Sequence, residues 1–116
     1  MKLIFSLLFG LSALAADFAG PWKFSYRISS GITREGNFDL RINGDQVTGT
    51  ITSDRGTANI ESGQIHGNEI SFRVVRHSNY DDIEVRYEGK LDGGTLRLKM
   101  QYGTHDPIAI TATKPS

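Results

Sequence analysis

A six-residue frame recurs three times in this 116-residue chain, and it constrains the fold more than any other feature. Each frame has an apolar residue, four turn-forming or polar residues with glycine second, and another apolar residue. Glycine there allows the positive φ that a two-residue hairpin turn requires. The bracketing apolar residues then lie opposite each other on one sheet face, so the frames predict an antiparallel meander and its register. The three frames run from Ile42 to Val47, from Ile65 to Ile70 and from Leu91 to Leu96.

Apolar residues alternate with polar residues in eight segments, and no helical period follows the N-terminal segment. One apolar and one polar face suit a barrel or a sandwich and exclude a buried parallel sheet. The chain has no cysteine, so a secreted domain would depend on its core or on a closed sheet without free edges. We therefore expect an all-β fold, an eight-stranded antiparallel up-and-down β-barrel with no helix after the signal peptide. The expected strands lie within 22–28, 38–42, 47–52, 58–65, 70–74, 83–91, 96–102 and 108–112.

Three irregularities refine this prediction. Ile60 and Ile65 can both face inward only if an extra residue intervenes, and Ser62-Gly63 is the natural place for a β-bulge. Gly49 and Gly89 occupy inward positions within strands, which indicates tight coiling of the barrel wall.

The N-terminus has the features of a secretory signal peptide. A basic start at Lys2 precedes an apolar run over residues 3–14, and small residues at Ala13 and Ala15 favour cleavage before Ala16. The run is shorter than the roughly 20 residues of a membrane span, although an N-terminal anchor is the alternative. We expect a signal peptide over 1–15, one β-barrel domain over 16–116, and a secreted or periplasmic bacterial protein without a membrane span in its mature form.

Charge and composition narrow the classes of partner. Loss of Lys2 leaves 12 basic and 13 acidic side chains, a balance that argues against nucleic acid or an anionic membrane surface. The absence of cysteine excludes thiol catalysis and thiolate metal sites.

The two ends of such a barrel differ. All three glycine frames lie at one end, because connections in a meander alternate between ends. The other connections, over 29–33, 53–56, 77–82 and 103–107, are less tightly specified. Loops held by a rigid wall commonly carry function, so we name this second end the mouth and expect the functional site there.

The segment Gly20-Pro21-Trp22 opens the first strand with a Gly-x-Trp motif. In this position it resembles the start of lipocalins and of the wider calycin superfamily, and the chain is similar to small secreted bacterial barrels of that type. The resemblance implies that Trp22 closes the base of the barrel beneath a basic residue of the last strand, here Lys114. Trp22 is the only tryptophan, so the tryptophan-lined biotin site of avidins is not implied.

Strand parity places two arginines, Arg34 and Arg76, at the rim of the mouth. Two guanidinium groups above an apolar interior suit an amphiphile with a carboxylate or sulfate head group. The alternative is that both arginines turn into solvent and pair with Asp54 or Asp106. Under the first interpretation, the ligand-binding residues would be Tyr26, Arg34, Phe38, Val74, Arg76, Met100 and Tyr102.

Other polar residues of the mouth give no recognisable catalytic or metal motif. His77, Asp81 and Asp82 share one loop, and His105 and Asp106 share another, but no pair has a known ligand spacing. Such residues more often serve as solvated turn formers, and no serine lies in a nucleophile elbow. We expect no enzyme activity, no cofactor and no metal.

Two functions remain from the sequence. The first is a non-catalytic barrel that binds a small apolar or amphiphilic molecule at its open end. The second is a protein-interaction module, a secreted inhibitor or accessory domain, with a filled barrel. Cavity volume distinguishes them, because a carrier needs a few hundred Å³ near Tyr26 and Tyr102.

Overall fold

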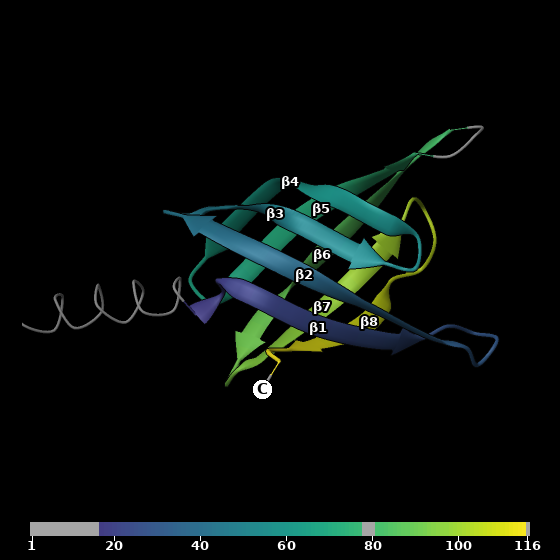
Figure 1. The fold of residues 1–116 in the computed structure, drawn as a ribbon, viewed down its shortest axis with the longest axis horizontal. Coiled ribbons are helices and arrows are strands. Elements are labelled where there is room, and N and C mark those ends of the chain that lie inside the picture. Colours follow the sequence, from purple (N-terminus) through teal and green to yellow (C-terminus); the bar gives the residue numbers. More distant parts are fainter. Residues whose placement is uncertain (1–16, 78–80, 116) are drawn as a thin grey trace, which may run out of the picture.

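Eight antiparallel strands form a closed barrel in this computed structural model, which describes residues 17–77 and 81–115 (Figure 1). Each strand pairs with the next along the chain, and the last pairs back with the first. The predicted all-β, eight-stranded up-and-down barrel is confirmed. The expected signal peptide lies outside the described residues. The strands are β1 (Gly20–Arg27), β2 (Thr33–Asn43), β3 (Gln46–Ser53), β4 (Gly56–His66), β5 (Glu69–His77), β6 (Asp82–Asp92), β7 (Thr95–Tyr102) and β8 (Ile108–Thr113).

The hairpin register agrees with the prediction at all three glycine frames. Two-residue turns join β2 to β3, β4 to β5 and β6 to β7, and the first residue of each turn is a glycine with positive φ. This conformation matches the twist of the paired strands. The opposed pairs are Ile42 with Val47, Ile65 with Ile70, and Leu91 with Leu96.

The predicted bulge in β4 is also present. The β4–β5 register shifts between Glu61 and Gln64, and Ser62 has a φ of 52°, the only positive value for a non-glycine among the described residues. The extra residue lets both Ile60 and Ile65 point inward, where each is buried. One bulge thus restores the alternation that the sequence interrupts.

The barrel wall is tightly coiled at Gly89. A Cβ atom built there would lie 1.9 Å from the carbonyl oxygen of Arg97, on the adjacent strand β7. That approach leaves room for no side chain, so glycine is required at this inward position.

One expectation about the loops is wrong. The β3–β4 connection is a two-residue turn, Asp54-Arg55, as short as the turns at the opposite end. Ser53 pairs directly with Gly56, whose φ of 100° completes the turn. The residues that bracket this turn are serine and glycine, whereas an apolar pair brackets each of the other three turns. The six-residue sequence frame therefore does not predict the β3–β4 turn. The mouth therefore has one tight turn and three longer connections, over 28–32, 78–81 and 103–107.

Candidate functional site

Trp22 and Phe18 fill the end of the barrel opposite the mouth. Both side chains are fully buried, and the indole Nε1 of Trp22 donates a 2.8 Å hydrogen bond to the carbonyl oxygen of Phe18. The ammonium nitrogen of Lys114 lies 5.3 Å from the centre of the indole ring, within the range of a cation–π contact. Gly20 begins β1 with a φ of 107°. Sequence reasoning missed Phe18, because it precedes the first alternating segment.

Aromatic side chains fill the middle of the barrel. The rings of Phe24 and Phe38 have centroids 4.6 Å apart, and those of Phe72 and Tyr87 stack at 4.9 Å. Phe38 also meets both Phe72 and Tyr87 edge-on, each at 5.4 Å. Such offset and edge-to-face contacts are favourable ring geometries, and they leave the centre solid.

The remaining space on the mouth side is about 20 Å³ in volume. That is roughly the room one water molecule occupies, at about 10–15 Å³ on the same measure, and far below the roughly 300 Å³ at which ligand pockets begin. Its lining comes from β1, β2, β3, β5, β6 and β7, together with the Asp54-Arg55 turn. The lining residues are Phe24, Tyr26, Arg34, Glu35, Ile51, Ser53, Asp54, Arg55, Arg76, Tyr87, Met100 and Tyr102.

The seven residues expected to bind a ligand fall into two groups. Three of them, Phe38, Val74 and Met100, are at most 2% exposed and belong to the packed core. The other four stand partly buried at the rim of the mouth, and all four line the small cavity. These are Tyr26, Arg34, Arg76 and Tyr102.

Each of the two rim arginines predicted from sequence contacts a neighbouring polar side chain. Arg34 forms a salt bridge with Asp54, the pairing that the second interpretation of the rim arginines described. The Arg76 guanidinium lies 3.4 Å from Ser53 Oγ, rather than beside Asp106. Both partners lie at the mouth end of β3 or in the turn that follows it. These two guanidinium groups therefore already have polar partners within the protein.

Arg55 is the rim residue that the sequence did not single out. Its guanidinium donates to the hydroxyl of Tyr102 and lies 5.2 Å from the centre of that ring. Burial and the nearby Tyr102 raise the pKa of Tyr26 above its ordinary value. Tyr26 therefore remains an uncharged phenol at neutral pH.

Two hairpins extend from the barrel on the mouth side, β1–β2 and β5–β6 (Figure 1). Among the described residues, the first carries exposed Ile32, at 54% exposure, and the second carries exposed Ile83, at 38%. No other large hydrophobic side chain among residues 17–77 and 81–115 is exposed to this extent. Two exposed isoleucines thus flank a rim whose three arginines, Arg34, Arg55 and Arg76, have polar partners.

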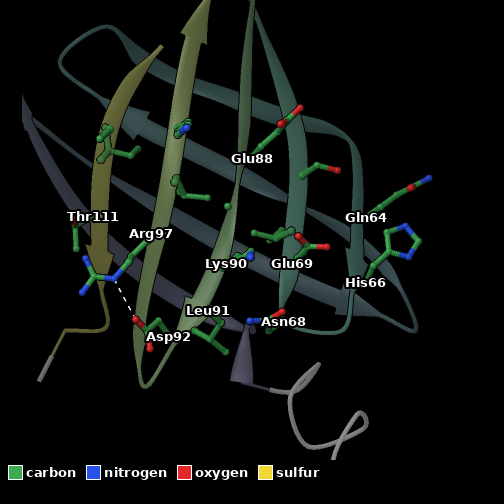
Figure 2. A pocket seen from close by; sticks show the side chains of 17 residues that line it. Gln64, His66, Asn68, Glu69, Glu88, Lys90, Leu91, Asp92, Arg97 and Thr111 are labelled. Carbon is green, nitrogen blue, oxygen red and sulfur yellow. Dashed lines mark hydrogen bonds and ion pairs between the residues drawn. The ribbon is translucent and has the colours of Figure 1, made fainter.

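A second concave region lies on the outer face of β4–β8 (Figure 2). This groove has a volume of about 850 Å³, and neutral polar residues such as Gln64, Asn68 and Thr111 contribute to its lining. Arg97 forms an ion pair with Asp92 at 3.3 Å, and Glu88 lies opposite Lys99 in the β6–β7 register. Three acidic and three basic side chains line the groove, so their formal charges cancel. Its charged residues are Glu69, Glu88, Lys90, Asp92, Arg97 and Lys99.

The histidines of the mouth do not come together. His77 Nδ1 lies 2.7 Å from Asp82 Oδ1, across the first pair of the β5–β6 hairpin, while the amide of His105 bonds to the carbonyl of Tyr102. Among the described residues, no three potential ligands form a group that could hold a metal ion. Within the same residues, no helix has the length and apolarity needed to cross a membrane.

Comparison with models of known protein families gave no match, and comparison with curated protein sequences gave none either.

Proposed function

We propose that this protein is a non-catalytic, secreted or periplasmic barrel that acts as a protein-interaction module and contacts its partner with the mouth. The observation that carries the proposal is the cavity of about 20 Å³ beneath the rim. Of the two functions expected from sequence, an interaction module is the one that a filled barrel favours. Carriage of an amphiphile would require the rim to open and the aromatic layer to move, because the core lies directly below.

The surface of the mouth supports the same proposal. Ile32 and Ile83 stand exposed on separate hairpins, on either side of a rim that carries Arg55 and Tyr102. Exposed apolar groups next to arginine and tyrosine form the composition typical of protein interfaces, whose energetic centres are rich in these two residue types. A partner that covers both isoleucines would also cover the paired polar groups between them.

A relationship to the calycin superfamily is part of the proposal. It is supported by the Gly-x-Trp start and by the position of Lys114 over the buried Trp22. This relationship concerns the scaffold, whereas the proposed function depends on the filled interior and on the mouth.

Site-specific photocrosslinking in the native compartment tests the proposal. A photoreactive amino acid replaces Ile32 or Ile83 and, as controls, exposed Thr48 near the other end and exposed Lys99 in the outer groove. We expect a discrete protein adduct from the two mouth positions and none from Thr48. Adducts from Lys99 alone would assign the interaction to the outer groove and contradict the mouth. The absence of any protein adduct from all four positions would contradict an interaction module.

A further inference from the structure

The pairing that closes the barrel is shortest where β1 meets β8. These strands pair over only three positions, Lys23 with Thr113, Phe24 with Ala112, and Ser25 with Thr111. Yet β1 continues to Arg27, and β8 begins at Ile108. The seam is therefore paired toward the base of the barrel and unpaired toward the mouth, where residues 26–27 face residues 108–110.

The two strand edges that face each other across this open seam are extended, although neither pairs with the other. Tyr26 and Arg27 still pair with β2, and residues 108–110 still pair with β7. Beyond β1, the amide of Ile28 bonds to the carbonyl of Ile32 at 3.0 Å, which holds the hairpin tip as a turn. A strand edge that is already extended and fixed on its other side is the template that an added strand requires.

The side chains along the seam indicate which sequence would fit. Tyr26 and Ile108 face inward but are only partly buried. An added strand with an apolar residue beside them would bury more apolar surface, which favours binding. On the outer face, Ala109 leaves space, and exposed Arg27 has no ion-pair partner among the described residues. A carboxylate on the outward side of the incoming strand would complement that guanidinium.

We infer that the open half of the β1–β8 seam binds an extended segment of a partner protein as an added β-strand, with an apolar residue facing inward and an acidic residue facing Arg27. The inference rests on the proposed function and supplies its mode of binding. Ile32 lies on the hairpin that continues directly from β1, so a partner held at the mouth brings its chain to the seam. Backbone hydrogen bonds would provide affinity, and the alternating side chains would provide specificity.

Selection from a display library of random octapeptides tests this mode on the intact protein. We expect enriched peptides with acidic and apolar residues in alternation. A synthetic peptide of the enriched sequence should slow amide hydrogen exchange at residues 26–27 and 108–110, and not in the outer groove. Failure of any peptide to enrich, or protection confined to other strands, would overturn the inference.

A charge reversal supplies the matched control. Arg27→Glu should weaken binding of the enriched peptide about tenfold, because an attraction becomes a repulsion at a partly solvated site. Arg41→Glu reverses another exposed charge, on β2 and away from the seam, and should leave binding unchanged. Equal effects of the two variants would overturn the inference. If crosslinks from Ile32 and Ile83 persist while the peptide results fail, the interaction module stands and only strand addition is removed.

Discussion

The indole nitrogen of Trp22 and the carbonyl oxygen of Phe18 share a 2.8 Å hydrogen bond inside the base of the barrel, where both residues are fully buried. This bond ties the segment before β1 to the closed end. A buried indole N–H needs an acceptor, and the chain supplies it four residues upstream. The packed core therefore includes Phe18, which precedes the first strand.

Truncation of Phe18 measures that contribution. Phe18→Ala should lower the free energy of unfolding by about 3–5 kcal/mol, since it removes a fully buried ring and leaves a cavity. Trp22→Ala should have a loss of the same size. Guanidinium denaturation gives both values, and the control Ile32→Ala, at an exposed position, should change stability by less than about 0.5 kcal/mol. A loss below about 1 kcal/mol for Phe18→Ala would show that the segment is not part of the core.

The tight coil at Gly89 gives a second prediction. Gly89→Ala places a methyl group 1.9 Å from the carbonyl oxygen of Arg97, so the backbone of β6 or β7 must move. We expect a loss of about 1–3 kcal/mol, in the range of overpacking in a well-packed core. The neighbouring exposed change Lys90→Ala should be nearly neutral. Equal thermal stability of the two variants would mean that the wall relaxes freely at this point.

Stability should fall at alkaline pH because of Tyr87. Burial, with a smaller contribution from Tyr102, raises the pKa of Tyr87 well above its ordinary value. The folded protein then keeps a phenolic proton that the unfolded chain releases above about pH 10, so the stabilisation is full below that pH and is lost above it. Denaturant titration at about pH 8 and about pH 11 should show a decline that is smaller in Tyr87→Phe by about 1 kcal/mol. An identical decline in wild type and variant would contradict a raised pKa for Tyr87.

The sequence predicted the strands of this barrel and their register better than the residues at its two ends. Pairs such as Leu91 with Leu96 follow from turn chemistry and from alternation, which are local properties. The bulge at Ser62 could also be predicted, because Ile60 and Ile65 can both face inward only if an extra residue lies between them. The burial of Phe18 could not be predicted, because this residue lies outside every segment with alternating apolar residues.

The mouth depends on contacts between distant segments. Parity placed Arg34 at the rim, and Asp54 was one of two partners that the sequence suggested. Only the folded chain brings Arg34 of β2 beside Asp54 of the β3–β4 turn. The contact of Arg55 with Tyr102, separated by 47 residues, has no sequence signature. Cavity volume likewise follows from how Phe24, Phe38 and their neighbours interlock, which composition does not determine.

The rim arginines should not act as a head-group site. In isothermal titration calorimetry with a panel of fatty acids and anionic detergents below their micellar concentrations, we expect no saturable binding to wild type, because only about 20 Å³ lies beneath the rim. The double variant Arg34→Ala, Arg76→Ala should likewise show no saturable binding. Stoichiometric binding to wild type that this double variant abolishes would establish the amphiphile site instead.

Native mass spectrometry of the protein purified from its own compartment tests the central claim most directly. A filled barrel that recognises a protein should appear at the mass of the polypeptide alone or in a complex with another polypeptide. The complex should be lost when Ile32→Asp and Ile83→Asp are combined, since the two charges would be buried at the interface. A retained small molecule, bound in a 1:1 ratio and released only on denaturation, would contradict the account, because the barrel would then have to hold a cavity.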